Sequence, residues 1–300
     1  PQHWSSAASD VYKRQPMPSS NSLEKFLEEF SGDQFLIKEN DSRRLDPLRK
    51  SFEYEYGLTH FVDQFLISKN TLNLSKRNLT QLAKEFLLEG ERINNILKKQ
   101  FSNNENITEC ALAYLIPKIW PEKYPIMLSA SSPIRDWLTF SGVNALSRRC
   151  FSFRGASGID GTLSMALGIS RILHPLLLVT GDLSFLHDFN GWLIENSEKL
   201  NLTILLIDNN GGNIFNRLYE NHLKDDEIKR LFVMPKSVDF KKLAEANKVI
   251  FKDVSNLTEL KELLEWSLLK SKTVILRLKV NHISEIDERK NLLNKIYQDS

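Results

Sequence analysis

The sequence predicts an α/β protein whose last two-thirds form a doubly wound, mostly parallel sheet with helices on both faces. From about residue 105, short aliphatic runs alternate with helical stretches. These runs lack the polar alternation of half-exposed strands, so we expect both faces of the sheet to be covered. Two polar, glycine-containing loops follow two consecutive runs, where sheets of this class bind their ligands.

The expected strands of this domain are six short apolar runs. They are Ile126–Leu128, Cys150–Phe151, Leu176–Val179, Ile204–Ile207, Val249–Phe251 and Val274–Leu278. Helices are expected between them, near residues 160–172, 185–198, 239–247 and 256–270. Strands that alternate with helices are typical of β-α-β crossovers and therefore of parallel pairing. The domain is predicted to span residues 105–300.

The first part of the chain has weaker patterns. Residues 1–20 show no helical or strand periodicity, and we expect a disordered or artefactual tail there. A short amphipathic helix at 22–30 and a strand at Phe35–Ile37 are followed by a polar, irregular stretch to residue 56. One helix and one strand bury too little apolar surface to fold alone. We therefore interpret residues 21–56 as the C-terminal remnant of a domain.

A helical connection is predicted between these two parts. Residues 57–104 are helical in pattern and contain no proline. Ser75 or Asn78 is the expected N-cap of the long helix, because their side-chain oxygens accept hydrogen bonds from the first helical amides.

The composition excludes several classes of protein. Apolar residues make up 41% of the 300 residues, enough for a sizeable core. The net charge is only +2, which gives no case for binding nucleic acid. The apolar runs are too short to span a membrane. Two cysteines, Cys110 and Cys150, exclude a disulfide-rich scaffold and suit a reducing compartment, so we expect a cytoplasmic protein.

Two polar loops carry the strongest chemical signal. Residues Gly181–Ser184 follow one expected strand, and residues Asp208–Gly212 follow the next expected strand. Asp182 and Asn209 are 27 positions apart, which is the length of one β-α-β crossover. Carboxylate, amide and backbone carbonyl oxygens suit Mg²⁺ or Ca²⁺, and the amides that begin the following helix favour a phosphate. Each loop alone is more often a simple turn or cap. Together they predict a metal-bridged diphosphate.

These paired loops resemble the motif of thiamine-diphosphate enzymes, with Leu183 where most of that superfamily has glycine. Three segments closely resemble the 2-succinyl-5-enolpyruvyl-6-hydroxy-3-cyclohexene-1-carboxylate synthase family of menaquinone and phylloquinone biosynthesis. They are residues 181–190 with 209–215, residues 154–161 and residues 131–137. Two departures occur: Ala130 replaces an Asn of the family, and Ser132 replaces a Met. Arg44–Pro47 also fits the end of that family's central domain.

The resemblance implies a transferase that uses thiamine diphosphate and Mg²⁺, with Mn²⁺ as an alternative metal. Such enzymes condense isochorismate with 2-oxoglutarate and release CO₂. Their active site lies at a subunit interface of a homodimer or homotetramer. Asp182 and Asn209 would bind the metal through side chains and Gly211 through its carbonyl. The implied cofactor-binding residues are Ser157, Gly158, Ile159, Gly181, Asp182, Leu183, Ser184, Asn209 and Gly211.

Four further residues are implied in catalysis. Arg135 and Arg154 would pair with substrate carboxylates, because a guanidinium binds a carboxylate through two parallel hydrogen bonds. Ile214 and Phe215 would form an apolar wall beside the reacting carbon, and Ile159 would wedge the cofactor into its bent form. For these three apolar residues, burial in an ordinary core stays open as the alternative.

The activating glutamate of the family lies in an N-terminal pyrimidine-binding domain, for which this chain offers no candidate. We therefore expect the C-terminal half of the enzyme, inactive by itself, with an exposed apolar patch around Ile159 and Ile214–Phe215 where that domain would pack. Two alternatives stay open: another thiamine-diphosphate carboligase, such as an acetolactate synthase relative, and a diphosphate-binding half that works with a separate chain.

Overall fold

The computed structural model describes residues 10–13, 21–71, 81–102, 106–142, 145, 148–153, 158–193, 200–218 and 229–298. The chain divides into two compact units, residues 1–92 and 93–300, and each is described by itself. The division falls inside helix α3 (Gln81–Phe101), whereas the sequence placed the start of the second domain at residue 105. Among the described helices, none combines the length and hydropathy needed to cross a bilayer.

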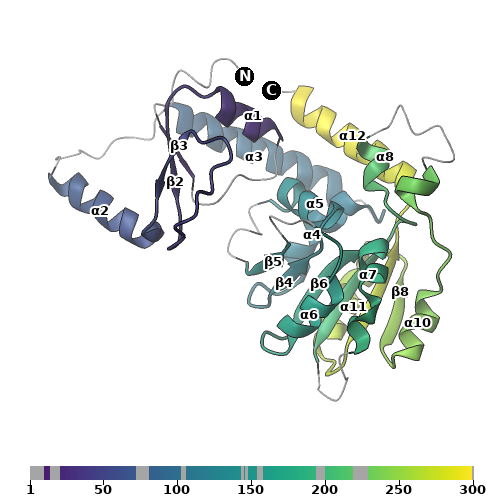
Figure 1. The fold of residues 1–300 in the computed structure, drawn as a ribbon. Coiled ribbons are helices and arrows are strands. Elements are labelled where there is room, and N and C mark those ends of the chain that lie inside the picture. The colour runs from purple at the N-terminus through teal and green to yellow at the C-terminus, as the bar shows by residue number, and fades with distance from the viewer. Residues whose placement is uncertain are drawn as a thin grey trace. The chain divides into compact units, whose positions relative to one another are not determined.

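The second unit contains a six-stranded parallel sheet in the order β5-β4-β6-β7-β9-β8 (Figure 1). Its strands are β4 (Ile126–Leu128), β5 (Cys150–Ser152), β6 (Leu176–Gly181), β7 (Leu202–Asp208), β8 (Ile250–Val254) and β9 (Val274–Lys279). The central strands β6 and β7 are buried along nearly their whole length, which explains their continuous apolar runs. The predicted parallel sheet is confirmed, and every expected strand is present.

Helices cover both faces of this sheet, as predicted. One apolar cluster packs a face against α4 (Glu109–Ile119), α5 (Ser132–Phe140), α11 (Leu257–Leu268) and α12 (His282–Gln298). A second cluster packs the opposite face against α6 (Thr162–Ser170), α7 (Asp182–His187), the 3₁₀ turn Phe189–Leu193 and α10 (Phe240–Ala246). The expected helix at 185–198 is thus two short elements, with residues 194–199 outside the described part.

Two more short elements lie near the carboxyl ends of the strands. They are α8 (Ile214–Leu218) and the π-helical turn η3 (Lys229–Val233). The sequence had not indicated α4, α5 or α12. In α4, eight of eleven residues are buried, so no polar face marks the helical period.

The first unit contains a three-stranded parallel sheet in the order β1-β2-β3. Its elements are β1 (Asp10–Lys13), α1 (Asn21–Glu29), β2 (Asp33–Ile37), β3 (Ser51–Tyr54), α2 (Gly57–Thr71) and the start of α3. The predicted helix and middle strand are confirmed, but the expectation of no regular structure at 1–20 and 41–56 was wrong for β1 and β3. Strands of four residues are too short to show a side-chain period and depend on backbone pairing with β2. Ser75 and Asn78 lie outside the described residues.

A buried lysine organises the loop that joins β2 to β3. The Lys38 ammonium donates to Glu53 at 2.9 Å, to Glu55 at 3.3 Å and to the Arg43 backbone carbonyl at 2.9 Å. These partners satisfy its three N–H groups, and they raise the pKa of Lys38 although burial opposes this. The pKa of Glu53 lies below its ordinary value. Burial raises this pKa, but hydrogen bonds from the Lys38 ammonium and from backbone amides lower it by a larger amount.

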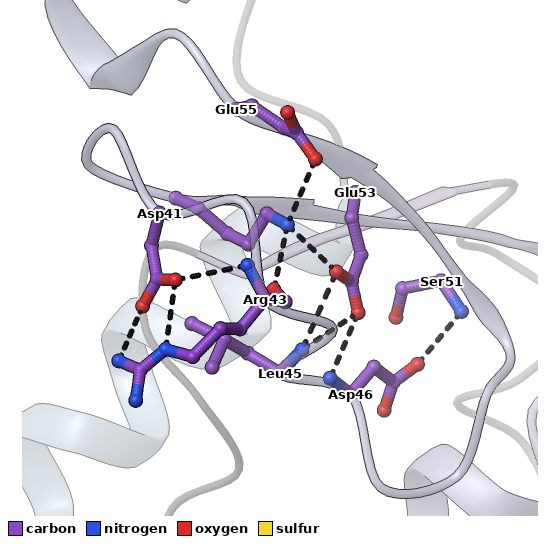
Figure 2. Close-up of polar contacts among 8 residues, drawn as sticks. Asp41, Arg43, Leu45, Asp46, Ser51, Glu53 and Glu55 are labelled. Carbon is purple, nitrogen blue, oxygen red and sulfur yellow. Dashed lines mark hydrogen bonds and ion pairs between the residues drawn. The ribbon is translucent and has the colours of Figure 1, made fainter.

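Two carboxylates complete this network (Figure 2). Glu53 also accepts from the backbone amides of Leu45 and Asp46. The Asp46 carboxylate accepts in turn from the amides of Leu48, Lys50 and Ser51. The loop therefore folds against the sheet through side-chain acceptors that take the place of a regular backbone ladder.

Candidate functional site

The site lies where the connections of the large sheet diverge. Strands β4 and β6 are neighbours, but the chain leaves β4 for β5 on one side and leaves β6 for β7 on the other. Such a switch point opens a crevice at the carboxyl ends of the strands. A cavity of about 450 Å³ occupies it, lined by residues that follow β4, β5, β6 and β7 and by the start of α4.

The structure brings most of the predicted site residues to this cavity. Those that line it are Arg135, Gly158, Ile159, Gly181, Asp182, Leu183, Ser184, Asn209, Gly211, Ile214 and Phe215. Arg154 and Ser157 lie outside the described residues. The two polar loops therefore meet, because Gly181 and Ile207 are paired in the parallel register of β6 and β7.

Asp182 is a buried carboxylate, only 2% exposed. Its Oδ2 accepts from the Gly211 amide at 2.7 Å and its Oδ1 from the Leu183 amide at 2.7 Å. Burial raises the pKa of Asp182 to about 6, although these two hydrogen bonds lower it; the nearby charges of Asp208 and Glu109 raise it further. An anion held here among other acids favours a cation as its neighbour.

Asn209, 8% exposed, presents an oxygen without a partner. Its Nδ2 donates to Glu109 Oε1 at 2.7 Å, and its backbone carbonyl accepts from the side chain of Asn213. Its Oδ1 is buried and has no hydrogen-bond partner among the described residues. A buried acceptor left unpaired is costly, so this oxygen fits a site that a metal ion completes.

Close backbone contacts explain the two glycines after Asn209. Gly211 has φ +118°, and a Cβ there would lie 2.2 Å from the Val233 carbonyl oxygen. A Cβ on Gly212 would lie 2.7 Å from the Phe232 carbonyl, and its amide donates to Val233. Glycine is therefore required where the end of η3 passes this loop. The Gly211 carbonyl accepts from the Asn213 amide at 2.9 Å, which leaves one lone pair for a further partner.

Hydroxyl groups join the loop after β5 to the loop after β6. Ser184 Oγ and Thr162 Oγ1 lie 3.0 Å apart, and Thr162 also donates to the Ile159 carbonyl at 3.0 Å. Both hydroxyls are buried beside the cavity. Ile159 is thus fixed through its backbone at the cavity wall.

Arg135 stands at the open side of the cavity. Its Nη1 donates to the Ser131 carbonyl at 2.8 Å, while the side chain as a whole is exposed. Ser131 has φ +74°, which a residue with a side chain rarely adopts, and it also lines the cavity. The strained turn before α5 therefore sets where this guanidinium lies.

Exposed apolar side chains lie beside the predicted loops, on and after η3: Leu231, Phe232 and Met234. Ile159, Ile214 and Phe215 themselves are half-buried. Phe215 packs against Phe232 with ring centroids 5.5 Å apart. The prediction placed an exposed apolar patch around these residues, and Phe232, which contacts Phe215, is one such exposed side chain.

Sequence reasoning missed Glu109, which lines the cavity from the first turn of α4. It also missed Asn213, whose side chain fixes the Asn209 carbonyl. Glu109 lies outside the motifs of the sequence analysis, whereas Asn213 lies inside the segment 209–215 but had no role assigned to it. The only signal was Thr108, an N-cap whose side chain accepts from the Ala111 amide and marks the start of a helix.

Comparisons with known proteins agree with this geometry. Residues 138–278 match the family described as thiamine pyrophosphate enzyme, C-terminal TPP binding domain. Over 94% of its length the chain is 58% identical to a 2-succinyl-5-enolpyruvyl-6-hydroxy-3-cyclohexene-1-carboxylate synthase of Prochlorococcus marinus strain MIT 9312, and 42% identical to that of strain NATL1A. The chain spans about half the length of the curated relatives it matches, 48% in both cases. The predicted resemblance is confirmed.

Solved structures share the fold at low identity. A benzoylformate decarboxylase from Polynucleobacter necessarius aligns with a TM-score of 0.61 at 12% identity, over 92% of this chain and 50% of that one. A thiamin diphosphate-dependent enzyme described as putative, from Mycobacterium smegmatis, aligns with a TM-score of 0.54 at 14% identity, over 91% of this chain and 48% of that one. At these identities the likeness shows the fold alone.

Proposed function

We propose that this chain is a thiamine pyrophosphate enzyme, since residues 138–278 match the C-terminal TPP binding domain of that family, and that its cavity holds thiamine diphosphate through Mg²⁺. The observation that carries the proposal is the unpaired, buried Oδ1 of Asn209 in the same cavity as the buried Asp182 carboxylate. The oxygen atoms of these two side chains are hard ligands, which suit Mg²⁺ or, as the alternative, Mn²⁺. The Gly211 carbonyl is the proposed third protein ligand.

When bound, thiamine diphosphate supplies the electron sink for decarboxylation of a 2-oxo acid. The residues of this chain would bind and orient the cofactor, and they would exclude water from it. Ser184, held by Thr162, is placed to donate to the diphosphate. Ile159, Ile214 and Phe215 form the apolar part of the wall, which keeps water from the reacting atoms.

We assign Arg135 to the substrate end, with Arg154 as its proposed companion from the sequence motif. The two proposed substrates, isochorismate and 2-oxoglutarate, carry carboxylates that a guanidinium binds with two hydrogen bonds. The reaction would be their decarboxylating condensation to 2-succinyl-5-enolpyruvyl-6-hydroxy-3-cyclohexene-1-carboxylate. Support comes from two relatives, each 58% identical to this chain, that carry the name of this synthase.

The organisation of the whole protein is part of this proposal. Residues 105–300 are the proposed diphosphate-binding domain, 57–104 a helical connection and 21–56 the end of a central domain. We propose a cytoplasmic homodimer or homotetramer whose active site includes the pyrimidine-binding domain of a neighbouring subunit.

Metal-dependent cofactor binding tests the proposal directly. Isothermal titration of this chain with thiamine diphosphate is expected to give heat in the presence of Mg²⁺ and none in EDTA. Asp182→Ala should abolish it, whereas Asp239→Ala, an exposed helix cap, should not. Binding that is independent of both metal and Asp182 would contradict the proposal. For the reaction, this chain combined with the remaining half of the MIT 9312 relative should form product and CO₂ from both substrates.

A further inference from the structure

Glu109 contacts the proposed metal site from a distant part of the chain. It lies in the first turn of α4, is 3% exposed, and lines the cavity. Its Oε1 accepts from Asn209 Nδ2 at 2.7 Å, although the two residues are 100 positions apart in the sequence. The contact is therefore made by the tertiary fold alone.

This contact decides which way the Asn209 amide faces. The two ends of an amide have nearly the same shape, so packing alone selects weakly between them. An ionised carboxylate only accepts hydrogen bonds, so the NH₂ end must face Glu109. The Oδ1 then faces away from Glu109, and it is buried without a partner among the described residues.

The negative charge of Glu109 has local support. The residue directly follows the N-cap Thr108, and the positive end of the helix dipole at this terminus favours an anion. The first-turn amides of Glu109 and Ala111 already donate to Glu285 Oε2 and to the Thr108 side chain.

The backbone of Glu109 is held independently of its side chain. Its amide donates to Glu285 Oε2 at 2.6 Å. Arg289 in turn donates to Glu285 Oε1 at 2.8 Å and to Asp136 Oδ1 at 2.7 Å. The position of α4 at this point is thus fixed from α12 and α5 through the Glu109 backbone amide, by a contact that does not use the Glu109 carboxylate.

We propose that Glu109 is a positioning residue that turns the Asn209 amide oxygen into the cavity for the metal ion. The proposal rests on the proposed function, since it requires that Asn209 bind a cation. In metal sites, a partner that orients a ligand in this way typically contributes about 10- to 100-fold to metal affinity.

A double-mutant cycle tests this, with Mn²⁺ as the probe and electron paramagnetic resonance as the measurement, in the presence of thiamine diphosphate. Glu109→Ala should weaken Mn²⁺ binding about 10- to 100-fold. Glu109→Gln should keep most of the affinity, because its side-chain oxygen still accepts from Asn209. In an Asn209→Ala background, Glu109→Ala should have no further effect. Glu262→Ala, an exposed glutamate of α11, is the matched control.

The outcomes separate the two proposals. Unchanged Mn²⁺ affinity in Glu109→Ala overturns the positioning role alone, and so does an equal loss in Glu109→Ala and Glu109→Gln or a loss that persists without Asn209. Wild-type protein that binds no Mn²⁺ overturns the proposed function as well. If Glu109→Ala does not fold, Glu109→Asp withdraws the carboxylate by one methylene and should weaken binding in the same sense.

Discussion

The backbone amide of Gly211 donates to the buried Asp182 carboxylate at 2.7 Å, and this bond ties together the two loops that follow β6 and β7. The carboxylate therefore has a fixed place before any ligand arrives. Gly211 meets two structural constraints. Its amide faces the Asp182 carboxylate, and its Cα lies so close to the Val233 carbonyl that a Cβ would not fit. A site whose donors are already held in place loses less conformational entropy on binding.

Replacing this glycine should destabilise the protein and weaken the site. Gly211→Ala places a methyl group 2.2 Å from a backbone oxygen at φ +118°, so the loop must move. Strain of this kind costs about 1–3 kcal/mol, which urea denaturation monitored by circular dichroism will measure. The control is Gly168→Ala, an exposed position in α6 with open space, which should stabilise by about 0.5–1 kcal/mol. Equal stability of the two variants would contradict this account.

The Asp182 pKa predicts how the stability of the metal-free protein depends on pH. The folded pKa of about 6 lies above the ordinary aspartate pKa of 3.8, so the folded state binds this proton more tightly. The contribution of Asp182 to the free energy of unfolding should therefore fall by roughly 3 kcal/mol as the pH rises from about 4 to about 6.

Comparison with Asp182→Asn isolates this group. Urea denaturation in EDTA at pH 4 and pH 7 should show a larger loss of stability for the wild type than for Asp182→Asn, because the amide does not titrate. The same pH dependence in both proteins would mean that Asp182 is not the titrating group.

The sequence predicted the parallel sheet and the meeting of the two polar loops for physical reasons that are now visible. A strand covered on both faces, such as Leu202–Asp208, leaves a continuous apolar run. Parallel strands joined by one crossover place their following loops at the same edge, which brought Asp182 and Asn209 to one cavity. Local pattern and regular topology were enough for these features.

Other features depend on contacts that no local pattern records. The role of Glu109 follows from a tertiary contact with a residue 100 positions later. Helix α4 shows no period because nearly every side is buried. Strand β3 is short and half-exposed, and the Lys38 network that holds the preceding loop joins residues from both ends of that loop.

The Lys38 network makes a prediction for the first unit. Lys38→Met removes the donor from Glu53 and Glu55 and leaves the Glu53 carboxylate half-buried beside two backbone amides. The urea midpoint of this unit should fall clearly more than for Lys25→Met, whose exposed pair with Glu29 is worth about 0.5 kcal/mol or less. Since the folded pKa of Glu53 is lowered, its contribution is present above its unfolded pKa and is lost as the pH falls. Equal midpoints for the two methionine variants would show that the network adds no stability.

Arg135 should affect substrate use and leave cofactor binding intact. Its guanidinium lies at the open side of the cavity, held by the Ser131 carbonyl at 2.8 Å, and Arg135 belongs to α5, a different element from those that carry Asp182 and Asn209. Arg135→Ala should therefore bind Mg²⁺–thiamine diphosphate like the wild type in isothermal titration. In the enzyme reassembled with the remaining half of its MIT 9312 relative, kcat/KM for 2-oxoglutarate should fall about 10- to 100-fold, because a charge-assisted hydrogen bond contributes roughly 1.5–3 kcal/mol. Arg135→Lys should recover part of this loss, since an ammonium keeps the charge but lacks the second parallel donor.

Arg149→Ala, an exposed arginine of the same unit, is the control and should change neither measurement. Loss of cofactor binding in Arg135→Ala, or turnover equal to the wild type, would remove Arg135 from the substrate end of the cavity.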